Sequence, residues 1–347
     1  MKETAAMPRV FIIVLNWNGV AHTIECLESL SRLSYPDYEI IVVDNGSSDG
    51  SVETIRRAFP WVLLIENNQN FGYTGGNNVG MYHALQHGAD YVWLLNNDTV
   101  VDPDVLGKLV AEAESSPEVG LISPLVRYYD DPEKVQYIGA YPDFANFEIN
   151  PVTDPCQLDD PQMQRLLILY GTALFVRKSV IEKIGFLKAR YFAYQEDFDY
   201  SLRALQAGFK TRVLMHAHIL HKESQTSGKR SPFHVFLMTR NVYFLWKDHL
   251  SGFRRMVMFW HYLSVMIGHL KYFYDQEEKP IFNACLEGVW AALRGKGGAP
   301  DQKGALPVWF RAVFRLFISW HPYFWINLFK GTLASQTRTR LFKTLNS

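Results

Sequence analysis

Continuous apolar runs alternate with amphipathic stretches along the first part of the chain. The runs lie at 10–16, 38–43, 61–67, 91–96 and 121–126, and stretches of helical spacing lie at 22–33, 51–59, 78–88 and 103–115. An uninterrupted apolar run is typical of a strand that is buried on both faces. Strands that alternate with helices predict an α/β fold, in which right-handed crossovers build a parallel sheet.

The second part of the chain is less regular. Residues 130–165 are rich in Pro, Asp, Asn and Gln, and they predict a long loop of the kind that often carries function. Order returns at 167–187 with a strand and a short helix, followed by a helix at 197–209 and a strand at 211–221. From residue 232 onward the pattern is helical, with an interruption at 294–304.

Small polar side chains follow four of these strands where the apolar run stops. The segments are 16–18 (NWN), 44–45 (DN), 96–98 (NND) and His221. Asn and Asp favour turns, because their side chains bond to local backbone. The alternative is a ligand site, because open parallel sheets bind ligands at the carboxyl ends of their strands. The turn interpretation must be invoked four times, whereas one site accounts for all four segments.

Sequence motifs and cysteine usage exclude several classes of protein. The glycine-rich segment GYTGG at 72–76 is not a G-x-G-x-x-G fingerprint, and no Walker loop is present. Cys26, Cys156 and Cys285 match no metal spacing and form no disulfide framework, which favours a reducing compartment. The first ten residues lack the apolar stretch of a signal peptide, so we expect a cytoplasmic protein.

The formal net charge of zero conceals an asymmetry. Residues 252–347 contain 13 Lys and Arg against 5 Asp and Glu, a net of +8, so residues 1–251 carry a net of −8. The basic part is rich in Trp and Phe, but Arg, His and Pro interrupt its apolar run at 309–329 before the roughly 20 residues that a bilayer requires. Two interpretations stay open: helices that lie in a membrane interface, and a helical subdomain with an aromatic core.

Four segments together resemble a family 2 glycosyltransferase, of the branch with rhamnosyl- and galactosyltransferases of bacterial surface polysaccharides. They are DNGSSDGS (44–51), NQNFGYTGGNNVG (68–80), LLNNDT (94–99) and YQEDFDYSLRALQAGF (194–209). The resemblance covers residues 9–245 and implies a GT-A fold, with a mostly parallel central sheet flanked by helices. We expect a catalytic domain at 1–245, with a donor half at 9–125 and an acceptor half at 126–245, and a helical C-terminal extension at 246–347.

The resemblance also implies a divalent metal, Mg²⁺ or Mn²⁺, at the donor diphosphate. Asn96-Asn97-Asp98 takes the place of the family's DxD motif. Asp98 would supply the hard oxygen that such a cation prefers, and Asn96 would add a carbonyl or hold a water. His221 matches the histidine that completes the metal shell in the family, although by itself it would be read as an ordinary strand-end histidine.

A nucleotide-diphosphate sugar is the implied donor. Asp44 would accept a hydrogen bond from N3–H of uracil or thymine, and Trp17 would stack on the base. The expected donor-binding residues are Asn16, Trp17, Asp44, Asn45, Gly72, Gly76, Asn77, Asn78, Asn97 and Arg240.

The resemblance also implies roles for the glycines and for the basic residues of this donor site. Gly72, Gly75 and Gly76 would let the backbone approach the donor closely. Many relatives have an Arg near the position of Asn77, so the diphosphate here depends more on the metal and on basic residues elsewhere. Arg240 would either meet the diphosphate or form a structural ion pair.

Glu196 and Asp197 correspond to the family's acidic pair on the acceptor side. An inverting transfer needs a base that takes the proton from the acceptor hydroxyl as it attacks the sugar carbon. We assign Asp197 as this base and Glu196 as the residue that positions the acceptor. The alternative is that acidic residues here only complement a helix dipole, which is our interpretation of Asp199.

The implied function is an inverting transfer of a rhamnose- or galactose-type sugar from a dTDP- or UDP-sugar to a lipid-linked or polysaccharide acceptor in bacterial surface glycan synthesis. A catalytically silent nucleotide-sugar-binding or scaffold protein is the alternative, and Asp98, Asp197 and His221 argue against it. A sugar-1-phosphate nucleotidyltransferase would need a glycine- and lysine-bearing loop that VLNWNGVAHT (14–23) lacks. The expected partners are the donor, the glycan acceptor and an anionic membrane surface at the inner face of the plasma membrane. No nucleic acid is expected, and a homo-oligomer is compatible with this interpretation.

Overall fold

The computed structural model describes residues 7–222, 231–300 and 306–319. The chain separates into two units, residues 1–225 and 226–347. This division falls before residue 245, where the sequence analysis placed the end of the catalytic domain, because α8 (Pro232–His249) packs against α9 (Gly252–Asp275) and α10 (Lys279–Arg294). The predicted features at 320–347 lie outside the described residues.

The first unit is built on a mixed sheet of nine strands, counted over the described residues. Its path runs β3-β2-β1-β4-β10-β6-β11-β5, and β7 pairs with β6. Strands β3, β2, β1 and β4 are parallel to one another, whereas β10 is antiparallel to both β4 and β6. The strands are β1 (Val10–Asn16), β2 (Tyr38–Asp44), β3 (Leu63–Glu66), β4 (Tyr91–Asn96), β5 (Thr99–Val101), β6 (Val119–Tyr128), β7 (Val135–Tyr137), β10 (Ala173–Arg177) and β11 (Lys210–His221). A separate hairpin pairs β8 (Ala140–Asp143) with β9 (Glu148–Pro151).

The strand register brings the polar strand ends to one edge of the sheet. Asn16 pairs with Asp44 across β1 and β2, and Asn96 lies beside the end of β1 on its other side. Because β10 is antiparallel to β4, its first residue, Ala173, lies at this edge. His221 ends β11 there as well, opposite the short strand β5. The four polar segments therefore share one edge, as the sequence pattern predicted.

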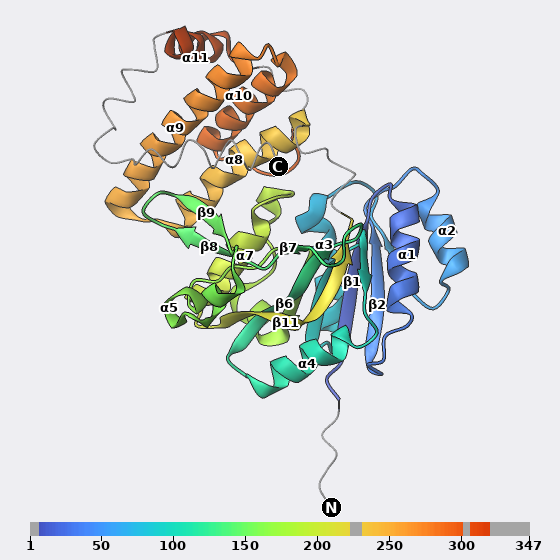
Figure 1. Cartoon of the computed structure of the whole chain (residues 1–347). Coiled ribbons are helices and arrows are strands. Elements are labelled where there is room, and N and C mark those ends of the chain that lie inside the picture. The colour runs from blue at the N-terminus through green and yellow to red at the C-terminus, as the bar shows by residue number, and fades with distance from the viewer. Residues whose placement is uncertain (1–6, 223–230, 301–305, 320–347) are drawn as a thin grey trace, which may run out of the picture. The chain divides into compact units, whose positions relative to one another are not determined.

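Helices cover both faces of the sheet, which explains why central strands such as β1 and β4 are almost entirely apolar (Figure 1). Side chains alternate between the faces of a strand, so Val10, Ile12 and Val14 of β1 join the core beneath α1, α2 and α4. Phe11 and Ile13 join the opposite core, beneath α3, α6 and α7. The helices of this unit are α1 (Val20–Leu30), α2 (Ser51–Ala58), α3 (Gly72–Gln86), α4 (Val105–Ser115), α5 (Pro161–Gln164), α6 (Lys178–Ile184) and α7 (Glu196–Gln206), with 3-10 turns η1 (Pro155–Asp159) and η2 (Ala189–Tyr191).

The structure differs from the sequence prediction in three places. The segment at 72–76, predicted as a turn, forms the first part of α3, which begins at Gly72. Strand β5 was not predicted, since three residues give too short a pattern. The long loop predicted at 130–165 contains β7 and the β8–β9 hairpin, whose short strands lack a continuous apolar run.

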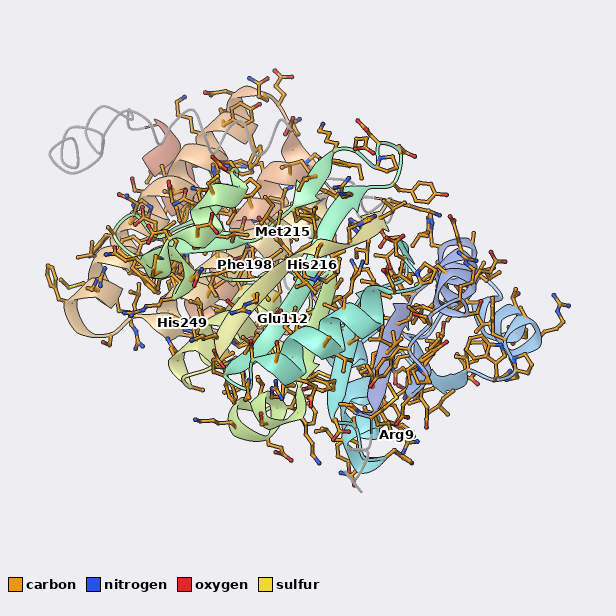
Figure 2. All side chains as sticks on the ribbon, turned by 60° about the horizontal axis from the view of Figure 1, so that its bottom comes forward. Arg9, Glu112, Phe198, Met215, His216 and His249 are labelled. Atoms are coloured by element: carbon orange, nitrogen blue, oxygen red, sulfur yellow. The ribbon has the colours of Figure 1, made fainter. Side chains whose placement is uncertain are left out.

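Ion pairs tie the helices to the sheet and to the loops. Glu112 of α4, labelled in Figure 2, pairs with Arg212 of β11. Asp199 of α7 is fully buried, and its oxygens lie 2.9 Å from Lys188 Nζ and 2.8 Å from Arg203 Nε. Asp199 thus fixes α7 against the segment before it and has a structural role.

The second unit is helical over its described residues. It contains α8, α9, α10 and α11 (Val308–Ser319). Helices α8 and α10 approach closely at Gly288 of α10. A Cβ at this position would lie 2.8 Å from the Phe236 carbonyl oxygen of α8. None of the helices in the described ranges is both long enough and apolar enough to cross a membrane.

The ion pairs of Asp199 generate a stability prediction. Asp199→Asn should lower the free energy of unfolding by about 3 kcal/mol, because it neutralises one buried partner while Lys188 and Arg203 stay charged. Lys188 and Arg203 are both partly exposed to solvent. The expected loss in the free energy of unfolding therefore lies at the lower end of the range for a broken buried ion pair. Urea denaturation measures the change. Glu118→Gln, which breaks an exposed pair with Lys210, is the control and should cost less than about 1 kcal/mol. Equal losses in the two variants would refute the structural role of Asp199.

Candidate active site

A two-residue turn joins β4 to β5 and places Asp98 against His221. Asn97 and Asp98 form this turn, and Thr99 at the start of β5 pairs with His221 at the end of β11. His221 Nε2 consequently lies 3.2 Å from Asp98 Oδ1. Both side chains are buried. The segment at 96–98 is thus both a turn and part of a polar cluster, so the two interpretations of the sequence do not exclude each other.

The contact between Asp98 and His221 suits either a hydrogen bond or two ligands of one cation, depending on which ring nitrogen carries the proton. Gln136 Oε1 lies 2.8 Å from His221 Nδ1, so the tautomer with its proton on Nδ1 would donate to Gln136 and direct the Nε2 lone pair toward Asp98. Nε2 is buried and, among the described residues, has no hydrogen-bond partner despite its nearness to Asp98. Two ligand atoms of an octahedral Mg²⁺ lie about 3 Å apart, close to the observed separation.

The pair fits a divalent cation only if other ligands complete the shell. No group of three or more His, Cys, Asp or Glu side chains in the described ranges is arranged to hold a metal. Burial raises the pKa of Asp98, but the contacts with His221, a backbone hydrogen bond and the nearby His22 together outweigh it, so the net shift of the pKa is downward. Asn96 is half-buried beside the pair, and its backbone carbonyl accepts a hydrogen bond from Thr99 Oγ1. The missing ligands would be water and substrate oxygens.

A chain of hydrogen bonds connects the strand ends on the donor side. Asn97 Nδ2 donates to Thr23 Oγ1 (2.9 Å), whose hydroxyl donates to Asn16 Oδ1 (2.8 Å). Asn16 Nδ2 then donates to Asp44 Oδ1 (2.7 Å), and Asp44 Oδ2 accepts from the Ser47 N–H (2.9 Å). Asp44 is 2% exposed, so its predicted contact with a base would depend on movement of this loop.

Asn45 has all its polar side-chain atoms occupied by the loop that leads into α3. Its Oδ1 accepts from Asn67 Nδ2 (3.0 Å) and the Phe71 N–H (3.2 Å), and its Nδ2 donates to Asn70 Oδ1 and the Gly72 carbonyl (both 3.0 Å). Asn45 therefore shapes the loop from within. The predicted donor contact of Asn45 stays a prediction.

The glycines of α3 allow close packing within the protein. Gly72 has φ +74°, and a Cβ there would overlap the Phe192 carbonyl oxygen. The same oxygen accepts a hydrogen bond from the Thr74 N–H (3.1 Å). A Cβ at Gly76 would overlap the Leu15 side chain. Thus the first turn of α3 is held against the segment that precedes α7.

The other predicted donor residues of α3 also bond within the protein. Asn77 Nδ2 donates to the Tyr73 carbonyl one turn earlier (2.9 Å). The Asn78 amide bonds twice to the Leu187 backbone, at 2.8 and 3.0 Å. Trp17, in contrast, is 44% exposed after the end of β1, so its ring is accessible to a ligand.

Glu196 and Asp197 begin α7 in a segment of unusual backbone conformation. Phe192, Tyr194 and Gln195 all have φ between +66° and +71°, which is costly for residues with side chains and is typical of functional sites. Asp197 accepts hydrogen bonds from the Gly171 and Phe198 N–H groups, both at 2.8 Å. These bonds fix its carboxylate at the start of the helix.

Burial separates the acidities of the two carboxyl groups. Burial raises the pKa of Asp197 to about 6, although the hydrogen bonds from Gly171 and Phe198 oppose the shift. Burial raises the pKa of Glu196 well above its ordinary value, and the charge of Asp197 adds to this. Glu196 Oε2 is buried and has no hydrogen-bond partner among the described residues. The Glu196 carboxyl group is therefore the weaker acid of the two.

Aromatic rings connect the acidic pair with the Asp98–His221 pair. Tyr137 lies 6.2 Å from the His221 ring and stacks on Tyr170 at 4.6 Å. Tyr170 in turn contacts Phe198 edge-on at 5.3 Å, and Phe198 directly follows Asp197. Phe198 is labelled in Figure 2. The two polar clusters are thus linked through packed aromatic rings within the first unit.

Sequence reasoning missed a brace around the end of β11. Lys222 Nζ pairs with Glu25 of α1, and Tyr129 Oη donates to the other Glu25 oxygen (2.7 Å). The Lys222 N–H donates to the Asp98 carbonyl (3.0 Å), so the brace adjoins the Asp98–His221 pair. In the sequence, the one indication that Lys222 lies near the site was its position directly after His221. Nothing in the sequence indicated its distant partner.

Arg240 is buried in the second unit. It lies between the rings of Phe236 and Phe244, and its guanidinium donates to the Gly298 carbonyl (2.6 Å). This environment agrees with a structural role within that unit. The donor-binding role of Arg240 remains a prediction.

The α/β sheet of the first unit carries polar and acidic side chains at the edge where its parallel strands end. The chain belongs to glycosyl transferase family 2, whose sequence profile matches residues 11–185. This confirms the family that the four segments predicted.

Comparisons with known proteins place the chain within the rhamnosyl- and galactosyltransferase-like branch of the family. It is 26% identical over 271 residues to the N-acetylglucosaminyl-diphospho-decaprenol L-rhamnosyltransferase of Mycobacterium tuberculosis, covering 72% of this chain and 87% of that protein. It is 29% identical over 219 residues to galactofuranosyltransferase GlfT1 of the same organism, covering 61% and 69%.

Solved structures confirm the predicted GT-A fold. The structure of S. aureus TarS 1–349 has a TM-score of 0.53 at 14% identity, covering 82% of this chain and 80% of that one. Mannosyltransferase PcManGT from Pyrobaculum calidifontis, solved with GDP-Man and Mn²⁺, has a TM-score of 0.51 at 14% identity, covering 92% and 88%.

The contact between Gly72 and Phe192 generates a prediction about activity. Gly72→Ala should reduce sugar transfer at least tenfold, because the new methyl group displaces Phe192 and, with it, the start of α7 that carries Asp197. Gly88→Ala is the matched control: Gly88 follows the same helix with φ +83°, but a Cβ there meets nothing within 4 Å. Steady-state transfer rates of the two variants, after thermal unfolding has shown both to be folded, decide the matter. Equal rates would mean that the contact does not position α7.

Proposed function

We propose that this protein catalyses an inverting transfer of a sugar from a dTDP- or UDP-sugar, of the rhamnose or galactose type, to a lipid-linked or polysaccharide acceptor in bacterial surface glycan synthesis. The observation that carries the proposal is the pair of clusters at one edge of the sheet: Asp98 with His221, and Asp197 with Glu196. Family membership supports the reaction type.

The donor would lie along the ends of β1, β2 and β4. The exposed Trp17 ring offers a stacking surface for the base, and the hydrogen-bond chain from Asn97 to Asp44 fixes the loops around it. Asp98 and His221, with Asn96 nearby, would hold Mg²⁺ or Mn²⁺, which stabilises the charge that develops on the leaving diphosphate. The brace of Glu25, Tyr129 and Lys222 would keep this edge of the sheet in place.

The acceptor would be activated at the start of α7. Asp197 has a pKa of about 6, so near neutral pH it is ionised and can take the proton from the attacking hydroxyl. Burial raises the pKa of Glu196 well above its ordinary value, which favours the protonated form that can donate a hydrogen bond to the acceptor. Environments that push two carboxyl groups apart in pKa are a mark of an acid–base site. Inversion follows if the hydroxyl attacks opposite the leaving group in a single displacement.

The acceptor and the location of the protein rest on its relatives. A relative that aligns over 72% of this chain is named for N-acetylglucosaminyl-diphospho-decaprenol, which supports a lipid-linked acceptor. Such an acceptor would be met at the cytoplasmic face of the plasma membrane, with the protein held there peripherally. A silent binding protein accounts less well for the buried Glu196 Oε2, which has no hydrogen-bond partner among the described residues.

One assay tests both the reaction and the role of Asp197 as its base. It combines a panel of dTDP- and UDP-sugars with a polyprenyl-diphosphate-linked glycan, in the presence of Mg²⁺ or Mn²⁺. The wild-type rate should rise through about pH 6 as Asp197 ionises, and fall at higher pH where Glu196 loses its proton. Asp197→Asn keeps the shape of the side chain but cannot take a proton, so transfer should fall by roughly 10² to 10⁴. Product analysis by mass spectrometry and NMR gives the transferred sugar and its anomeric configuration.

Controls separate catalysis from binding. The donor should still raise the thermal unfolding temperature of Asp197→Asn, because donor binding does not require this residue. Asp102→Asn, at an exposed carboxylate paired with His218, should leave transfer unchanged. Donor affinity that is lost in Asp197→Asn, with turnover preserved, would assign Asp197 to binding. A panel without any transfer product would refute the proposed function.

A further inference from the structure

Helix α9 has an apolar face that is exposed to solvent. Phe253, Met256, Val257 and Trp260, which we call the α9 ridge, are spaced at i, i+3, i+4 and i+7 and so share one face of the helix. Phe253 is 73% exposed and Trp260 is 48% exposed. Large side chains gathered in this way on a surface usually mark a site of interaction.

The ridge is separate from the side of α9 that forms the core of its unit. That side carries five buried residues spaced along the helix: Met258, Tyr262, Met266, Leu270 and Phe273. Tyr262 Oη donates to the Thr239 carbonyl of α8 (3.1 Å), and Tyr262 contacts the Tyr243 ring at 4.9 Å. Helix α9 is therefore apolar on two sides, and packing within its unit explains only one of them.

The charges around the ridge favour an anionic partner. Arg254 lies within the ridge sequence and is exposed. Helix α9 contains no Asp or Glu before Asp275, its last residue. Basic residues mixed with Phe and Trp are the composition of helices that lie in the interface of an anionic membrane. A protein-binding face would not require that carboxylates be absent from twenty-three consecutive residues.

A second helix of the same unit repeats this chemistry. On α11, Trp309, Val313 and Leu316 are exposed at i, i+4 and i+7, and Arg311 and Arg315 are exposed between them. Both helices are labelled in Figure 1. The repetition shows that the combination on α9 is a property of the unit rather than of one turn of helix.

We propose that the α9 ridge docks this protein onto an anionic lipid surface, with the four apolar side chains entering the interface and Arg254 meeting lipid headgroups. The inference rests on the proposed function in one respect, since a lipid-linked acceptor is presented at such a surface. The ridge extends over about two helical turns, roughly 12 Å, which suits a helix that lies flat in the interface.

Co-sedimentation of the full chain with vesicles, without any sugar donor, tests the proposal. The protein should bind vesicles of phosphatidylcholine with phosphatidylglycerol at low salt, bind pure phosphatidylcholine weakly, and be released by salt. Phe253→Glu and Trp260→Glu should each weaken binding at least tenfold, because they place a carboxylate on the ridge. Trp61→Glu is the matched control, since Trp61 is 53% exposed on the first unit, and it should bind as the wild type does.

Each contrary result identifies a different error. Failure of the wild type to bind anionic vesicles at low salt overturns the proposal, as does unchanged binding by both ridge variants. A wild-type dimer that Trp260→Glu converts to a monomer would assign the ridge to a second copy of this chain instead. Transfer to a water-soluble, short-chain acceptor should be normal in both ridge variants. If the wild type and both ridge variants all failed to transfer sugar while the wild type still bound vesicles, the proposed function would be refuted and the docking surface would stand.

Discussion

The two-residue turn at Asn97 and Asp98 is the constraint on which the site depends. It reverses the chain at the end of β4, so that β5 can pair with the last residues of β11. The pairing brings Asp98 within 3.2 Å of His221, although 123 residues separate them in the sequence. Gln136 on one side and the brace of Glu25 and Lys222 on the other hold this pair in the edge of the sheet.

Burial of the Asp197 and Glu196 carboxyl groups is the second constraint on the site, because it raises the pKa of both. The same low-polarity environment acts on Asp197 and Glu196, but hydrogen bonds from Gly171 and Phe198 favour the ionised form of Asp197 alone. The Gly72–Phe192 contact then ties these carboxyl groups to α3 and thus to the donor side of the sheet. The acidic pair and the first turn of α3 are consequently positioned by one continuous set of contacts within the first unit.

The parts of this fold that the sequence predicted are those with long, regular patterns. Strands β1, β2 and β4 are continuous apolar runs because helices cover both of their faces, and their shared edge follows from parallel topology. Strand β5 is too short to give a pattern, and the start of α3 is rich in glycine, a poor helix former that is held here by tertiary contacts such as Thr74 with Phe192.

The site was predictable in kind but not in detail. Motif order located Asp98, Asp197 and His221, yet it could not reveal that Asn45, Asn77 and Asn78 use their amides within the protein. A polar side chain at a strand or helix end can face a ligand or the protein itself, and only the fold decides which. The pairing of Glu25 with Lys222 joins residues 197 positions apart, a distance over which a single sequence carries no signal.

The most direct test of this account is Mn²⁺ binding, followed by electron paramagnetic resonance with a nucleoside diphosphate present. The wild type should bind Mn²⁺, and His221→Ala should weaken that binding at least tenfold, because Asp98 alone remains as a ligand. His218→Ala is the control on the same strand: His218 also lies near a carboxylate, 3.1 Å from Asp102, but the pair is exposed, and binding should not change. Equal Mn²⁺ affinity in His221→Ala and the wild type would contradict the assignment of the Asp98–His221 pair as the metal site.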